Sequence, residues 1–145
     1  MKLKTITIDL AKNVFQVCGV NEYIKPQLNK KLKCNELLDF MRQQSPTLVV
    51  MEACYSSRYW EREIAKLGHD TKLIPAQHVT PFVRGNKNDH NDAFAIAKAS
   101  QRDNIRFVPV KTEHQQETSC LHRIRVRRSK NKVALSHQSR GLLNE

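Results

Sequence analysis

Short apolar segments separated by polar turns make up most of the first 110 residues. Residues 3–10 and 14–20 are rich in β-branched side chains and partly alternate between apolar and polar, and the polar break between them is typical of a hairpin turn. A third strand is predicted over residues 23–28, where Pro26 favours the edge of a sheet. These three segments predict an antiparallel arrangement at the start of the chain.

Helical and extended segments alternate after this point. Apolar residues recur at helical spacing from Leu37 to Met41, and the continuously apolar run 48–51 predicts a strand buried on both faces. A second helix follows and ends at Gly68. The remaining predicted elements are a strand at 71–74, a helix at 89–100 and a strand at 105–110. This order predicts an α/β fold, with a sheet of mixed strand direction flanked by helices.

The segment after residue 110 is long and polar and contains no Gly or Pro until Gly141. A weak coiled-coil pattern recurs there every seven residues, at Leu121, Arg128, Leu135 and Leu142. We therefore predict two parts: an α/β domain over residues 1–110, and a basic helix over residues 111–145. The helix is the start of a coiled coil, through which we expect a homo-oligomer to form.

Charge narrows the class of protein. The chain has 25 Lys and Arg against 14 Asp and Glu, and a formal net charge of +11. This excess of positive charge favours binding to the phosphate backbone of a nucleic acid, although membrane-surface proteins and ribosomal accessory proteins have it too. No apolar run approaches the roughly 18 residues of a membrane span, and the first residues lack a signal-peptide pattern. We expect a cytoplasmic, nucleoid-associated protein without a membrane partner. The four cysteines lack paired spacing and are expected to be reduced and mostly buried.

Four carboxylates stand next to the ends of separate apolar segments, at Asp9, Glu52, Asp89 and Asp92. If the strands that end near Asp9 and Glu52 are adjacent, these two side chains meet, and a helix packed beside them would add the pair three residues apart. Such a set of oxygens suits Mg²⁺ or Mn²⁺ and phosphoryl displacement. Each aspartate alone has a simpler explanation, because an aspartate at a strand end or a helix start is commonly a turn or capping residue. Glu52 is harder to explain in this way, because it follows four consecutive apolar residues, where a carboxylate is expected to be nearly buried or to lie at a cleft.

A dense run of basic residues without an acidic one lies between Cys120 and Lys132. Its members are Arg123, Arg125, Arg127, Arg128, Lys130 and Lys132. The run predicts contact with a nucleic-acid backbone, although a solvated helix face would have the same composition. Lys12 and Lys87 are further candidates because they lie close in sequence to the carboxylates. Tyr59 and Trp60 could stack on bases, but their helical spacing favours a place in the core.

The segments TIDLAKNVFQVCGV, VVMEACYSSRYW and GNKNDHNDAFAIA resemble the DEDD transposases of bacterial insertion sequences, the one-hundred-and-ten family. The resemblance extends over nearly the whole chain and implies an RNase H-like fold similar to that of the RuvC Holliday-junction resolvase. It also implies a Mg²⁺-binding tetrad that is both metal ligand and catalytic centre. Carried over by motif, the tetrad is Asp9, Glu52, Asp89 and Asp92.

The same resemblance implies recombination of DNA ends in transposition, directed in some members by a structured guide RNA that the element encodes. Members also have a C-terminal domain that supplies a nucleophilic serine. We therefore expect this chain to be a fragment that needs that domain for full activity. Two alternatives remain. One is a non-catalytic protein that binds structured nucleic acid. The other is an actin-like or sugar-kinase nucleotide-binding domain, which the scarcity of glycine disfavours.

Overall fold

The computed structural model describes residues 3–83, 89–102 and 104–144, and of residues 89–91 it describes the backbone only. The chain divides into two compact units, Met1–Val110 and Lys111–Glu145. Each unit is described here by itself.

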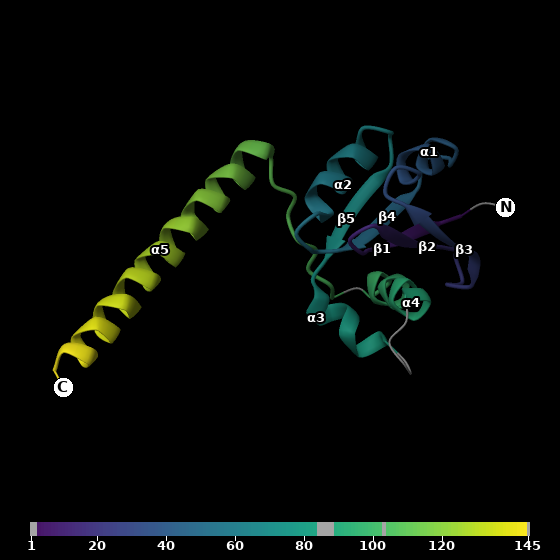
Figure 1. Ribbon diagram of the computed structural model, residues 1–145. Helices are drawn as coiled ribbons and strands as arrows, with labels where there is room; N and C mark the ends of the chain where they lie inside the picture. The colour runs from purple at the N-terminus through teal and green to yellow at the C-terminus, as the bar shows by residue number, and fades with distance from the viewer. Residues whose placement is uncertain (1–2, 84–88, 103, 145) are drawn as a thin grey trace. The chain divides into compact units, whose positions relative to one another are not determined.

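The first unit is built on a five-stranded sheet (Figure 1). The strands are β1 (Thr5–Leu10), β2 (Val14–Val20), β3 (Pro26–Lys33), β4 (Leu48–Glu52) and β5 (Asp70–Ile74). Their order is β3-β2-β1-β4-β5. The first three strands are antiparallel neighbours, whereas β4 and β5 run parallel to β1. The predicted sheet of mixed strand direction is confirmed.

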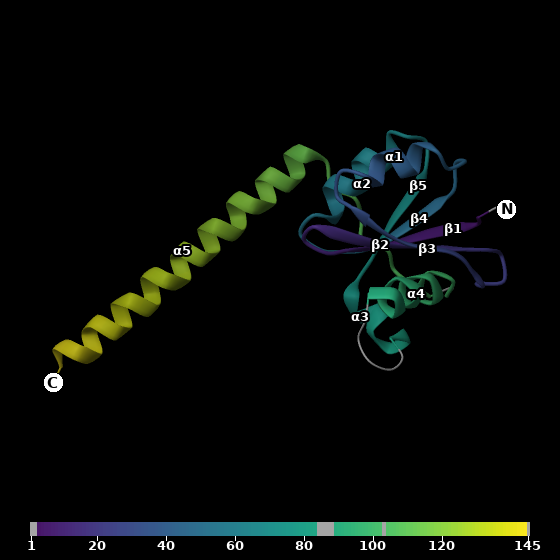
Figure 2. The same ribbon diagram turned by 45° about the vertical axis from the view of Figure 1, so that its right-hand side comes forward.

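The two faces of the sheet are covered by different helices (Figures 1 and 2). On one face, Ile6 and Ile8 pack in a core cluster with residues of α1 (Leu37–Arg42) and α2 (Ser57–Ala65). This packing follows from the alternation in β1, since successive side chains of a strand point to opposite faces. Apolar side chains at even positions of β1 therefore fill this core, and odd positions face the other layer.

The other layer contains α3 (Ala76–Val79), the short 3-10 helix η1 (Thr80–Phe82) and α4 (Asp89–Ser100). Ala93 and Ala97 of α4 cluster with Cys18 and Val20 of β2, and all four are buried. Small side chains let the helix approach the sheet closely. As a result, α4 lies across the strands that carry the candidate carboxylates.

Two predicted strands differ from the observed ones. The third strand begins at Pro26 rather than residue 23, because the Asn21 side chain accepts hydrogen bonds from the backbone N–H groups of Tyr23 and Lys25 and holds this segment in a turn. The strand predicted over residues 105–110 is wrong. There, Val108 forms only an isolated antiparallel bridge with Leu73. Pro109 follows directly and has no backbone N–H to extend the pairing.

The second unit is the helix α5 (Glu113–Leu143). It begins with a capping box, in which the Thr112 hydroxyl accepts from the Gln115 backbone N–H and the Gln115 side chain accepts from that of Thr112. None of its described residues is buried, and Leu121, Leu135 and Leu142 are exposed. The predicted long basic helix is confirmed. Within the described part of the chain, no helix is both long and apolar enough to cross a bilayer.

Candidate metal and nucleic-acid site

The ends of β1 and β4 place Asp9 and Glu52 side by side. The two strands are parallel neighbours, and their register runs from Thr5 opposite Leu48 to Ile8 opposite Met51. Asp9 and Glu52 are the next residues along both strands. Because neighbouring strands lie about 4.8 Å apart and paired residues share a face, these two carboxylates belong to the same corner of the sheet.

That corner lies on the side covered by α4. The Thr7 hydroxyl donates a 2.7 Å hydrogen bond to the backbone carbonyl of Ala93 in α4. Val50, which pairs with Thr7, clusters with Ile96 of the same helix. Asp9 and Glu52 each follow these residues by two positions, so they lie on the same face as α4.

Helix α4 adds a third carboxylate on this side. Asp92 directly precedes Ala93, and it lies four residues before the fully buried Ile96, on the same side of the helix. Its Oδ1 atom is buried and has no hydrogen-bond partner within the described part of the chain. A buried carboxylate oxygen without a partner is costly, and a cation is one way to satisfy it.

The fourth predicted ligand, Asp89, is the first residue of α4. Its side chain lies outside the described residues, and so does Lys87. Among the side chains that are described, no three His, Cys, Asp or Glu are close enough together to form a metal site. The structure thus brings Asp9 and Glu52 together and packs the helix of Asp92 on their face, but it does not close a full set of ligands.

The electrostatics of the corner favour a cation. Asp9, Glu52 and Asp92 are all partly buried, and Asp9 and Glu52 each take part in a polar or electrostatic interaction. Two carboxylates about 5 Å apart repel by roughly 3 kcal/mol at a protein-like dielectric. Their donor atoms are all oxygens, which fits Mg²⁺ or Mn²⁺ rather than zinc.

Sequence reasoning missed one polar residue beside this corner. Gln16 of β2 pairs with Asp9 on one side and with Lys31 of β3 on the other, so the three lie in one row across the sheet. Gln16 is buried, and its amide donates a hydrogen bond to the Asn29 side chain. A single polar residue within the apolar segment VFQVCGV could have indicated this position.

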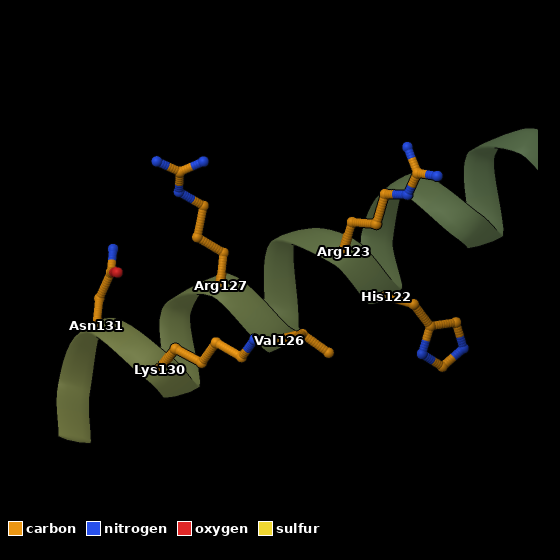
Figure 3. Close-up of a pocket in the computed structure, with 6 residues that line it drawn as sticks. All are labelled: His122, Arg123, Val126, Arg127, Lys130 and Asn131. Atoms are coloured by element: carbon orange, nitrogen blue, oxygen red, sulfur yellow. The ribbon is translucent and has the colours of Figure 1, made fainter. Parts of the chain in front are cut away.

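The predicted basic residues of the second unit all lie on α5 and are exposed. Figure 3 shows that Arg123, Arg127 and Asn131 extend on one side of the helix and that His122 extends on the opposite side. Arg125 and Arg128 lie at other angles around the axis. The basic run therefore surrounds the helix rather than forming one stripe. Lys12 is exposed in the turn between β1 and β2.

The cysteines take no part in a described metal site. Burial raises the pKa of the Cys18 thiol, so this residue stays uncharged at neutral pH. Cys34 and Cys120 are exposed, which corrects the expectation that the cysteines are mostly buried.

A first prediction concerns the contact between β1 and α4. Thr7→Val removes the short hydrogen bond to the Ala93 carbonyl and a longer one, of 3.2 Å, to the Cys18 carbonyl, and is expected to lower the free energy of unfolding by about 1 kcal/mol. Thr5→Val is a matched control, because Thr5 is equally buried on the same face and its hydroxyl has no hydrogen-bond partner among the residues that the structure describes. This control is expected to leave stability unchanged or to raise it. Urea unfolding measures both, and equal losses in the two variants would contradict the assigned contact.

Comparisons with known proteins identify the family of this chain. The transposase family model of the DEDD, IS110 type matches residues 6–145. A probable family 20 transposase from Pseudomonas aeruginosa is 46% identical over 145 residues, which are 100% of this chain and 43% of the relative. The transposase for insertion sequence element IS1111A from Coxiella burnetii is 42% identical over 143 residues, covering 99% of this chain and 39% of the relative.

Among solved structures, RuvC of Thermus thermophilus aligns with a TM-score of 0.53 and 11% identity over 72% of this chain and 99% of RuvC. The same protein in complex with a Holliday junction substrate gives a TM-score of 0.50 at 10% identity, over 72% of this chain and 98% of that one. At such identities the likeness shows the fold, which is RuvC-like. The chain spans about two-fifths of the length of the curated relatives that it matches. It belongs to the DEDD transposase family of the IS110 type.

Proposed function

We propose that the chain binds Mg²⁺ or Mn²⁺ through Asp9, Glu52, Asp89 and Asp92 and activates DNA for strand cleavage, as part of a transposase that recombines DNA strands in the transposition of an insertion sequence. The observation that supports this most is the position of Asp9 and Glu52 at the ends of adjacent parallel strands, under the helix that carries Asp92. Membership of the DEDD family supports the same assignment.

The strands and the helix that carry the proposed ligands hold them in fixed positions. Asp9 and Glu52 extend from central strands, which hold their positions better than loops would. Thr7 fixes the start of α4 against β1, and so it sets the distance of Asp92 from the two strands. When bound, the cation polarises a phosphodiester group and stabilises the charge that develops on it.

DNA is the proposed substrate. RuvC, which has the same fold, has been solved in complex with a Holliday junction substrate. The net charge of +11 attracts a polyanion, and we assign backbone contacts to the basic residues of α5 together with Lys12 and Lys87. A guide RNA encoded by the element would use the same charges. The exposed leucines of α5 support pairing with a second copy of the helix.

Because the chain spans about two-fifths of its relatives, we assign to it metal binding and phosphodiester activation. The complete transposition reaction is proposed for the longer proteins, in which a serine supplied by another domain is the nucleophile. The second candidate function is binding of structured nucleic acid without catalysis. It is supported by the net charge of +11 and by the exposed basic residues of α5, which do not depend on a metal site.

A cleavage assay distinguishes these functions. The protein and its Asp9→Asn variant are each incubated with branched DNA and Mn²⁺. Metal-dependent cleavage that Asp9→Asn abolishes supports the proposal. Metal and DNA binding without cleavage favours the second function.

A separate prediction concerns the basic helix. The triple replacement Arg125→Gln, Arg127→Gln and Arg128→Gln removes three phosphate contacts, so the slope of log K against log salt should decrease by about 2.7 for duplex DNA. The matched control neutralises three exposed cations of the first unit: Lys25, Arg42 and Lys66. Fluorescence anisotropy of labelled DNA over a series of salt concentrations measures both slopes. Equal slopes in the triple variant and the parent would remove α5 from the DNA-binding surface.

A further inference from the structure

A surface hollow of about 530 Å³ lies on the face of the sheet opposite α4. The residues that line it and matter for its chemistry are Asn13, Lys33, Cys34, Asn35, Tyr59 and Trp60. They come from the turn after β1, the end of β3 and the helix α2, with Asn35 just before α1. None of Asp9, Glu52 and Asp92, which we call the carboxylate corner, lines this hollow, so it is a separate feature of the first unit.

One wall of the hollow is aromatic and rigid. Trp60 is 7% exposed, and its ring meets Phe15 edge to face with centroids 5.1 Å apart. Tyr59 meets Trp60 in the same way at 5.2 Å, but it is 50% exposed. The buried pair thus holds a tyrosine ring in a fixed orientation with part of its surface open. A flat base can stack on such a ring whatever its identity.

The rim of the hollow is polar and positively charged. Asn13 and Asn35 present amides that both donate and accept, and Lys33 presents an ammonium group. Within the described part of the chain these three side chains make no hydrogen bond, so their groups are available to a ligand. Amides fit the edge of a base, and an ammonium group fits a phosphate.

The hollow lies near the same ends of the strands as the carboxylates Asp9 and Glu52. Asn13 follows Asp9 by four residues, in the turn that ends β1, and Lys33 pairs with Val14 at the start of β2. Four residues of extended chain span at most about 14 Å. A nucleic-acid strand that passes over these ends of the β-strands can therefore reach the carboxylates on one face of the sheet and the hollow on the other face.

We propose that this hollow binds an unpaired base of single-stranded DNA, stacked on Tyr59, with Lys33 on the neighbouring phosphate. The proposal rests on the proposed function and specifies its substrate, a strand with unpaired bases beside the position of cleavage. Duplex DNA keeps its bases stacked inside the helix and would not enter.

The chain contains its own probe, since Trp60 is its single tryptophan. Titration with an oligothymidylate in EDTA should change Trp60 emission saturably, and duplex DNA of the same length should not. Tyr59→Ala should weaken this binding by roughly 5- to 150-fold, which is the usual range for one stacked base. Tyr59→Phe keeps the ring and should bind within about twofold of the parent.

Tyr23→Ala is the matched control, because Tyr23 is an exposed tyrosine in the turn before β3. It should bind oligothymidylate like the parent. An oligonucleotide that binds without changing Trp60 emission would contradict the proposal, as would equal affinities for Tyr59→Ala and Tyr23→Ala. Mn²⁺ affinity of Tyr59→Ala is measured in parallel. If it is unchanged while the base-binding result fails, the hollow is refuted and the metal site stands.

A second readout uses Cys34, which is exposed in the hollow. In a variant with Cys120→Ser, oligothymidylate should slow alkylation of Cys34 in proportion to its saturation of the site. An alkylation rate that the oligonucleotide leaves unchanged would overturn the proposal independently of the fluorescence result.

Discussion

Asp9→Asn is expected to weaken binding of Mn²⁺ by roughly 100-fold or more, because loss of a direct ligand costs at least as much as the upper range for outer-shell partners. The replacement keeps the size of the side chain and removes its charge. Glu52→Gln and Asp92→Asn should act in the same direction, since the register aligns Glu52 with Asp9 and the helix of Asp92 packs on the same face of the sheet. Calorimetric titration with Mn²⁺ measures the three affinities.

The control for this experiment is Asp70→Asn. Asp70 begins β5, at the opposite end of the parallel strands from Glu52, and it is exposed. Its replacement should leave Mn²⁺ affinity unchanged. Without metal, Asp92→Asn should keep or slightly raise stability, since it relieves repulsion between carboxylates. Equal Mn²⁺ affinities in Asp9→Asn and Asp70→Asn would show that β1 contributes no ligand.

Trp60→Ala is expected to lower the free energy of unfolding of the first unit by about 3–5 kcal/mol. The indole is almost fully buried within the main apolar cluster, where it meets the Phe15 ring edge to face, so its removal leaves a large cavity between α2 and the sheet. A loss of this size is a large share of the stability of a small domain.

Native-state hydrogen exchange of the amides in β1 and β4 measures this loss in the sheet itself. Tyr59→Ala is the comparison, because its half-exposed ring contributes less to the core. It should cost less than about 1 kcal/mol. Similar losses for both replacements would mean that Trp60 does not anchor α2 as its contacts indicate.

The elements that could be predicted from sequence are those whose own pattern decides them. The strands at 14–20 and 48–52 and the helix Asp89–Ser100 are apolar segments with clear polar ends, and the structure has them within a residue of the prediction. The segment 105–110 is also rich in apolar residues, but its pairing depends on β5 and is limited to Val108. Local pattern cannot determine a contact that a distant partner sets.

For the carboxylates, too, local sequence indicates the residues but not the contacts between distant segments. The sequence places Asp9 and Glu52 near the ends of apolar segments, but it does not say that β4 adds to β1 in parallel and in a register that aligns them. Nor does it say which face α4 covers, which the Thr7 hydrogen bond and the packing of Val50 establish. The hollow beside Tyr59 was missed because helical spacing assigns Tyr59 and Trp60 together to the core. The structure buries Trp60 and leaves Tyr59 half exposed.

The central claim is that residues far apart in sequence share one divalent cation. A crystal structure of the protein grown with Mn²⁺, with anomalous differences recorded near the manganese edge, tests this most directly. We predict a peak about 2.0–2.3 Å from carboxylate oxygens of Asp9, Glu52 and at least one aspartate of α4. A fully bound protein whose only peak lies elsewhere, such as beside His122 on α5, would contradict the account.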